Sequence, residues 1–176
     1  MNESIPAVVV TGPVGSGKTT TAFAMGELLE ANDIPHAIVD MDHLRSVYPA
    51  PEGDRFATRI GYRSLAAIWP NLRSVAPRVV VLADVVESRE NIAEFEASLP
   101  GTRVTVVRLD VPLDLVLSRL EARQSASTID WYRYRAPELQ AIMEREQVAD
   151  LVIDVGERTP ENVAREILIA MDVIPS

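Results

Sequence analysis

The feature that most constrains the fold is an alternation of short apolar runs with longer stretches of helical pattern. Five runs are rich in valine, isoleucine or leucine and lack the alternation of apolar and polar residues typical of a half-buried strand. The runs lie at 7–11, 37–40, 79–84, 104–109 and 151–155. Helical patterns cover 19–31, 87–99, 113–123, 137–147 and 160–171. Strands buried on both faces and separated by helices predict an α/β fold with a doubly wound parallel sheet.

Composition limits the classes of protein to which the chain can belong. With 176 residues and 47% hydrophobic content, we expect one domain, 1–176, with its own core. The absence of cysteine excludes disulfides, thiolate metal sites and cysteine nucleophiles. A net charge of −9 argues against a nucleic-acid partner held through its phosphates. Because no apolar run reaches membrane-spanning length and no signal peptide is visible, we expect a cytoplasmic protein without a membrane partner.

The one lysine of the chain lies in a glycine-rich segment directly after the first apolar run. The segment fits the pattern G-x-x-x-x-G-K-[ST] of a P-loop, and it stands between a predicted strand and a predicted helix. Glycines let successive backbone N–H groups point at phosphate oxygens, so we predict an ATP site. In this pattern Lys18 contacts the β- and γ-phosphates and the Thr19 hydroxyl binds Mg²⁺. The predicted nucleotide-binding residues are Gly12, Pro13, Val14, Gly15, Ser16, Gly17, Lys18, Thr19 and Thr20.

Carboxylates follow the second and third apolar runs. Asp40 and Asp42 come at the carboxyl end of a predicted parallel strand, which is where such sheets bind ligands. One of them can orient Mg²⁺ and the other can accept the proton of an attacking hydroxyl; we favour Asp42 as the base, with the opposite assignment left open. The alternative is that Asp42 caps a short helix beginning at His43. Asp84 ends a run typical of a Walker B segment and is a further candidate for indirect Mg²⁺ binding.

Three arginines recur at helical spacing in the segment 54–75, which can form a helix. Arg55, Arg59 and Arg63 would share one helix face. Arginine captures phosphate, sulfate or carboxylate in a bidentate manner, so these residues are candidates for binding an anionic acceptor. A solvated arginine face is the alternative, and both interpretations stay open at this stage.

Two further arginines follow the fourth apolar run. Arg119 and Arg123 are four residues apart at the end of the helix predicted over 113–123. On a closing lid they would neutralise charge on the transferred phosphoryl group, whereas at a helix end they need only interact with its dipole. The irregular segment 124–135 is predicted to be the lid loop. Its aromatic and basic residues could also stack on a base, but the acidic balance of the chain disfavours nucleic acid.

Together these motifs resemble those of adenylylsulfate kinase, within the P-loop kinases of nucleosides and metabolites. Residues 12–20 match its P-loop, 40–45 resemble its D-G-D-N-x-R segment, and 134–138 resemble its Y-E-A-P-x segment. The resemblance implies a three-layer P-loop fold with strand order 2-3-1-4-5 and helices on both faces. It also implies ATP- and Mg²⁺-dependent phosphorylation of a hydroxyl on a small molecule, with Asp42 and Arg45 on the acceptor side.

The departures from this family fall on the acceptor side. Met41 and His43 replace the glycine and asparagine of the D-G-D-N-x-R segment, and the run ending in Asp84 looks more like that of chloramphenicol-phosphotransferase-type kinases. The resemblance therefore implies a kinase without fixing adenylylsulfate, or another anion, as its acceptor. The alternative function is a P-loop protein that binds or hydrolyses ATP for regulation and has no small-molecule acceptor. A homodimer is left open.

Overall fold

The centre of the molecule is a five-stranded, all-parallel sheet. The structure is a computed structural model that describes residues 4–123 and 128–175. For Arg123 it describes only the backbone. The strands are β1 (Ile5–Thr11), β2 (His36–Asp40), β3 (Val79–Ala83), β4 (Thr102–Asp110) and β5 (Leu151–Asp154). Their order is β2-β3-β1-β4-β5, which confirms both the predicted α/β fold and the order that the resemblance implied.

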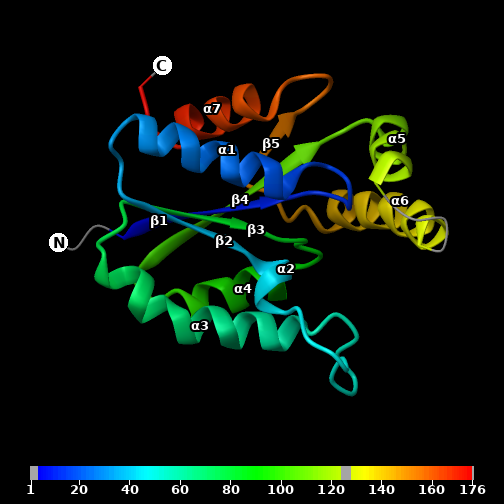
Figure 1. Ribbon diagram of the computed structural model, residues 1–176, viewed down its shortest axis with the longest axis horizontal. Coiled ribbons are helices and arrows are strands. Elements are labelled where there is room, and N and C mark those ends of the chain that lie inside the picture. The colour runs from blue at the N-terminus through cyan, green and yellow to red at the C-terminus, as the bar shows by residue number, and fades with distance from the viewer. Residues whose placement is uncertain (1–3, 124–127, 176) are drawn as a thin grey trace.

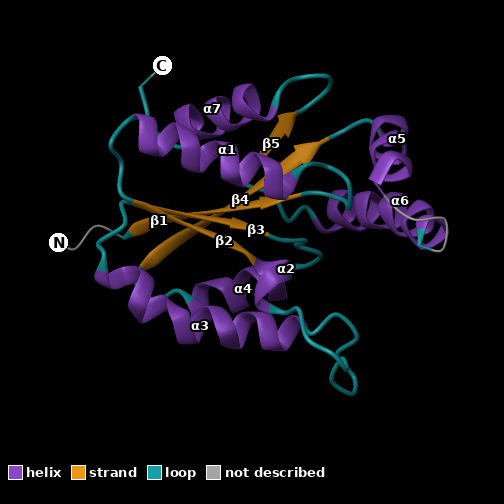
Figure 2. Ribbon diagram, in the orientation of Figure 1, coloured by secondary structure: helices purple, strands orange, loops and turns teal. Residues whose placement is uncertain are grey.

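Helices cover both faces of the sheet (Figures 1 and 2). α1 (Lys18–Ala31) and α7 (Pro160–Ala170) lie on one face, and α3 (Thr58–Ser74) and α4 (Arg89–Ser98) lie on the other. α2 (Met41–Leu44), α5 (Leu113–Arg123) and α6 (Ile129–Glu146) lie toward the carboxyl ends of the strands. The carboxyl edge of the sheet is therefore surrounded by short helices and loops.

The central strand shows why the apolar runs do not alternate with polar residues. Val8 and Val10 pack in a core cluster with residues of α1 and α7. Ala7 and Val9 pack in a second cluster with residues of α3 and α4. All four side chains are fully buried, because each face of β1 is covered by helices. A strand in this position exposes neither of its faces to solvent, so polar residues do not alternate with apolar ones along it.

Two predicted segments differ from the structure. The loop predicted over 124–135 is wrong from Ile129 onward, because α6 begins there and contains Pro137 instead of starting at it. A proline inside a helix removes one backbone hydrogen bond, and the apolar side chains Ala136, Leu139 and Met143 hold α6 by their burial. The part of this prediction on 124–127 lies outside the described residues.

The predicted helix over 54–75 begins later than expected. α3 begins at Thr58, and the carboxylate of Asp54 accepts hydrogen bonds from the backbone N–H groups of Thr58 (2.8 Å) and Arg59 (3.0 Å). Asp54 satisfies donors that the first turn of a helix leaves unpaired. Arg55 therefore precedes the helix, and the expected face of three arginines is not formed.

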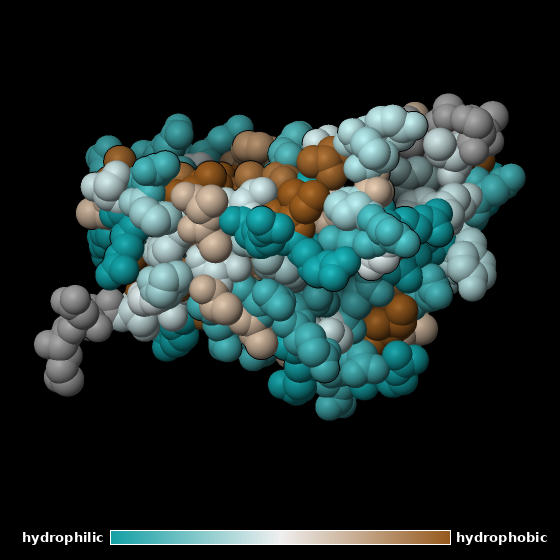
Figure 3. Space-filling view, turned by 90° about the horizontal axis from the view of Figure 1, so that it is seen from below, coloured by the Kyte–Doolittle hydropathy of each residue, from teal (hydrophilic) through white to brown (hydrophobic). Residues whose placement is uncertain are grey.

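Among the described residues, the surface on the side of α3 and α4 has no single dominant hydrophobic patch (Figure 3). Viewed from that side, it is mostly hydrophilic, with small and separate hydrophobic areas (Figure 3). None of the helices in the described part of the chain combines the length and the apolar character needed to cross a bilayer.

Candidate active site

The glycine-rich segment between β1 and α1 forms a tight loop. Gly15 and Gly17 have φ angles of 85° and 97°, in the left-handed region that favours glycine. A Cβ on Gly15 would lie 2.9 Å from Leu120 Cγ, so a side chain has no room there. The loop is closed by a hydrogen bond of 3.1 Å from the backbone N–H of Ser16 to the carbonyl of Pro13. This geometry brings the start of α1, and its unpaired N–H groups, to the end of β1.

Lys18 lies across this loop. Its ammonium donates hydrogen bonds to the carbonyl oxygens of Gly12 (3.0 Å) and Pro13 (3.1 Å). Burial lowers the pKa of the Lys18 ammonium to about 8, although Asp42 and Asp84 act in the opposite direction. Two neutral carbonyls compensate a buried cation only in part. An anionic phosphate would therefore be a better partner than those that Lys18 has in this structure.

Asp40 joins the start of α1 to the end of β2. Its Oδ2 accepts a hydrogen bond of 2.8 Å from the Thr19 hydroxyl, and its Oδ1 accepts one of 2.9 Å from the backbone N–H of Asp42. The alternative in which Asp42 caps a helix beginning at His43 is therefore wrong, because Asp40 caps α2 and that helix begins at Met41. The carboxylate of Asp42 is free of capping and is 72% exposed.

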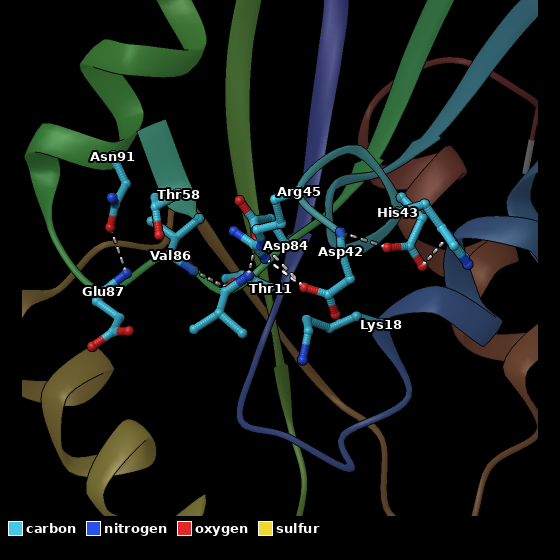
Figure 4. Close-up of polar contacts among 12 residues, drawn as sticks. Thr11, Lys18, Asp42, His43, Arg45, Thr58, Asp84, Val86, Glu87 and Asn91 are labelled. Atoms are coloured by element: carbon cyan, nitrogen blue, oxygen red, sulfur yellow. Dashed lines mark hydrogen bonds and ion pairs between the residues drawn. The ribbon is translucent and has the colours of Figure 1, made fainter. Parts of the chain in front are cut away.

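Arg45 links Asp42 to a carboxylate at the end of β3. Figure 4 shows its guanidinium between Asp42 and Asp84, with Lys18 beside Asp42. Arg45 Nη2 lies 2.6 Å from Asp42 Oδ1 and also contacts Asp84 Oδ1. Asp84 accepts a second hydrogen bond from the N–H of Val85 at 2.8 Å, and burial raises the pKa of its carboxyl group. The described contacts of Asp84 thus hold Arg45, and its role at a metal stays a prediction.

These groups lie at one end of a cavity of about 540 Å³. Lys18, Asp42 and Arg45 line it together with side chains from three other parts of the chain. These are the start of α3 with the loop before it, the segment after β3 with the start of α4, and α6; they include Phe56, Thr58, Glu87, Asn91, Trp131 and Arg135. The cavity therefore connects the P-loop to a space large enough for a small organic molecule.

Known proteins resemble this arrangement in structure but not in sequence. No protein-family model matches the chain, and no curated protein matches it. The tunicamycin resistance protein of Deinococcus radiodurans superposes with a TM-score of 0.69 at 21% identity, covering 97% of each chain. Adenylylsulfate (APS) kinase of Mycobacterium tuberculosis, in complex with AMPPNP and APS, gives a TM-score of 0.64 at 19% identity, covering 96% of this chain and 98% of that one. This chain has the P-loop kinase fold.

A third similar structure points the same way. Shikimate kinase of Acinetobacter baumannii, in complex with shikimate, gives a TM-score of 0.62 at 19% identity, covering 96% of this chain and 94% of that one. Similarity at this level of identity describes the fold. The roles of individual residues must be argued from the geometry of this P-loop kinase fold itself.

The arginines expected to bind an acceptor lie elsewhere. In the described part of the chain, Arg55, Arg59 and Arg63 are exposed and are not among the residues that line the cavity. Arg59 Nε lies 3.6 Å from Asp54 Oδ2, and the Arg55 guanidinium lies over the Phe56 ring at 5.5 Å from its centroid. The geometry fits the solvated alternative for all three.

Of the two arginines predicted to lie on the lid, the structure describes the side chain of Arg119 and not that of Arg123. Arg119 Nη1 lies 3.5 Å from the carbonyl oxygen of Ser16, so α5 does bring this guanidinium to the P-loop. The side chain of Arg123 lies outside the described residues, and its role at the nucleotide stays a prediction.

Sequence reasoning missed a second ion-pair group in the cavity. Arg135 Nη2 lies 2.5 Å from Glu87 Oε1, and Arg135 Nη1 lies 2.7 Å from Glu138 Oε2. Glu87 and Arg135 are 48 residues apart, and no motif connects them. The one available signal was the aromatic and basic segment near Trp131, which indicated a ligand contact without showing which residues would meet.

Proposed function

We propose that this protein is a phosphotransferase that uses ATP and Mg²⁺ to phosphorylate a hydroxyl group of a small molecule. The observation that carries the proposal is that Lys18 and Asp42 line one cavity. A P-loop lysine binds the phosphates of the donor, and an accessible carboxylate beside it can act on the acceptor. A protein that only binds nucleotide needs the first group and not the second.

The proposed transfer uses four side chains. Lys18 and the N–H groups of the P-loop bind the phosphates, and Asp42 accepts the proton of the acceptor hydroxyl. The bond between the acceptor oxygen and the γ-phosphorus forms while the bond from that phosphorus to the β,γ-bridging oxygen breaks, and ADP leaves. Arg45 holds Asp42 in place through its 2.6 Å contact. Arg119, whose guanidinium lies beside the P-loop, would neutralise charge on the transferred group.

Thr19 and Asp40 fit a magnesium site. Their oxygen atoms lie 2.8 Å apart at the start of α1. Mg²⁺ takes few protein oxygens and completes its shell with water and phosphate. Residues 4–123 and 128–175 contain no group of three or more histidine or acidic side chains arranged to hold a metal ion. When bound, Mg²⁺ would neutralise charge on the β- and γ-phosphates.

Two similar structures support the same class of reaction. One is a kinase bound to shikimate and the other is a kinase bound to AMPPNP and APS, so both act on small molecules. Use of ATP and Mg²⁺ also fits the cytoplasmic location expected from the sequence. An anionic acceptor like adenylylsulfate has less support, because the three arginines predicted to bind it do not line the cavity.

The competing function is an ATP-dependent regulator without a small-molecule acceptor, and Asp42→Asn separates the two. For a kinase, loss of the base lowers acceptor-dependent ADP release by about 10²- to 10⁴-fold and leaves ATP binding intact. A regulator would keep its ATPase rate in the same variant. Asp33→Asn is the matched control, because Asp33 is exposed in the turn after α1, where asparagine tolerates its positive φ of 53°. Unchanged turnover in Asp42→Asn, measured beside this control, contradicts the proposal.

A further inference from the structure

Both arginines that line the cavity are already paired with carboxylates. Arg45 contacts Asp42 and Asp84, and its side chain is only 12% exposed. Arg135 contacts Glu87 and Glu138, and its side chain is only 14% exposed. Each arginine thus meets two acidic groups, whose negative charges compensate that of the guanidinium and weaken its attraction for an anionic ligand. Away from the P-loop, the cavity therefore disfavours negative charge.

Aromatic side chains line the same cavity, and the Arg135 guanidinium lies over one of them, the Phe56 ring, at 5.9 Å from its centroid. Phe56, from the loop before α3, and Trp131, from α6, have ring centroids 6.2 Å apart. Tyr132 packs against Trp131 edge to face, with centroids 4.8 Å apart. Phe56 and Trp131 remain 47% and 37% exposed, and both line the cavity. Large apolar side chains held open in a cavity are suited to burying a flat apolar group of a ligand.

The two observations together restrict the acceptor. Resting on the proposed function, we propose that the acceptor is a hydroxyl compound that carries an apolar ring and has no phosphate, sulfate or carboxylate group. The ring packs on Phe56 and Trp131, and the hydroxyl reaches Asp42. An amino group on the same molecule gains from Glu87, which is 36% exposed at the cavity.

Three phenyl compounds of similar shape and one compound without a ring test this directly. Phenylpropanediol is uncharged, phenylalaninol is cationic, phenyllactate is anionic, and glycerol has hydroxyls without a ring. Binding is followed by the fluorescence of Trp131, because Trp69 is buried and gives a constant background. Phosphorylation is followed separately as ADP release.

We expect phenylpropanediol and phenylalaninol to bind at least about tenfold more tightly than phenyllactate and glycerol. Equal or tighter binding of phenyllactate overturns the charge part of the proposal. Glycerol binding as tightly as phenylpropanediol overturns the aromatic part.

Variants of the aromatic wall provide a second test. Trp131→Ala and Phe56→Ala should each weaken phenylpropanediol binding, measured by calorimetry, by about tenfold. Tyr134→Ala is the matched control, because Tyr134 lies on the same helix, is 70% exposed and is not among the cavity-lining residues of the described chain. Normal binding in both wall variants contradicts the proposal.

Glu87→Gln tests the paired arginine. Removing this carboxylate frees one side of Arg135, so phenyllactate should gain at least about threefold in affinity relative to phenylpropanediol. An unchanged ratio contradicts the proposed role of the ion pair.

Binding and transfer fail separately in this design. If the ring compounds bind as expected and no probe is phosphorylated, the proposed transfer is contradicted and the cavity chemistry stands. If phenyllactate is phosphorylated in preference to phenylpropanediol, the kinase activity stands and the inference about the acceptor is overturned.

Discussion

The P-loop and the acceptor part of the cavity differ in how far apart their residues lie in the sequence. The P-loop contributes contiguous residues, 12–20, whose conformation follows from glycines and from the start of α1. The acceptor part combines Phe56, Glu87 and Arg135, which come from three separate segments. A contiguous motif can be recognised by itself, whereas a site assembled from distant segments exists only once the chain has folded.

The two regions also differ in how they treat charge. At the P-loop, the partners of the Lys18 ammonium within hydrogen-bond distance, among the described residues, are two neutral carbonyls, so it has much to gain from a phosphate. On the acceptor side, Arg45 and Arg135 are each held by two carboxylates. This contrast predicts that the cavity binds negatively charged ligand groups at the P-loop and not on the acceptor side. The following changes test that contrast.

The largest effect is expected at the P-loop. Lys18→Ala removes the ammonium that we propose binds the phosphates, so kcat/KM for ATP-dependent transfer should fall by about three orders of magnitude. Steady-state ADP release with a saturating acceptor measures it, and circular dichroism confirms that the variant is folded. Turnover within about tenfold of the wild type would show that the contrast between the two regions is wrong.

A smaller effect is expected from the carboxylate behind Arg45. Asp84→Asn weakens the anchor that holds Arg45 and, through it, Asp42, so kcat should fall by about tenfold to a hundredfold while KM for ATP is unchanged. The split between kcat and KM distinguishes a positioning role from general damage. Glu166→Gln on α7, which breaks an ion pair with Arg158 in the loop before that helix, is the control. Equal changes in both parameters would argue against positioning.

The pH dependence of stability should report the buried lysine. Because burial lowers the pKa of Lys18 from 10.5 to about 8, the unfolded chain binds this proton more strongly than the folded one. The contribution of Lys18 should therefore increase the free energy of unfolding as pH rises from about 8 to about 10.5, by at most about 1.4 kcal/mol per pH unit. Urea titrations of the wild type and of Lys18→Ala isolate this contribution. If the free energy of unfolding changed with pH equally in the wild type and in Lys18→Ala, the Lys18 ammonium would be as well solvated in the folded protein as in the unfolded chain.

The smallest effect is expected on α3. Arg59 is 71% exposed and its closest acidic partner, Asp54, is 3.6 Å away. Arg59→Ala should change the free energy of unfolding by less than about 0.5 kcal/mol and leave acceptor binding unaltered. Calorimetry with phenyllactate and phenylpropanediol checks the second point. Selective loss of phenyllactate binding would restore Arg59 as an anion site.

The fold was predictable because burial on both faces leaves a direct trace in the sequence. The central strands β1 and β3 read as apolar runs, since their side chains pack in the core clusters on both faces of the sheet. The P-loop was predictable for a different reason: all the residues of its pattern are contiguous in the sequence, so the pattern can be recognised before the chain is folded. The placement of Asp40 and Asp42 at the carboxyl end of β2 followed from the general position of ligands in parallel sheets.

The acceptor part was harder to predict because it depends on packing between distant segments. Pro137 suggested a helix start, but Ile129 and Tyr132 pack against the core ahead of it, so α6 begins at Ile129 and brings Trp131 to the cavity. The spacing of Arg59 and Arg63 suggested a shared functional face, which turned out to be exposed. Helical spacing shows which side chains share a face and not which face meets the ligand.

The most direct test of the central claim is phosphorus NMR of a reaction containing ATP, Mg²⁺ and the hydroxyl probes. A kinase should give a phosphate monoester of at least one probe, in the same amount as ADP. The Asp42→Asn variant should give neither product beyond the background of the protein-free reaction. If every reaction gave only inorganic phosphate and ADP, at equal rates for the wild type and for Asp42→Asn, the proposal of phosphoryl transfer to a small-molecule hydroxyl would be contradicted.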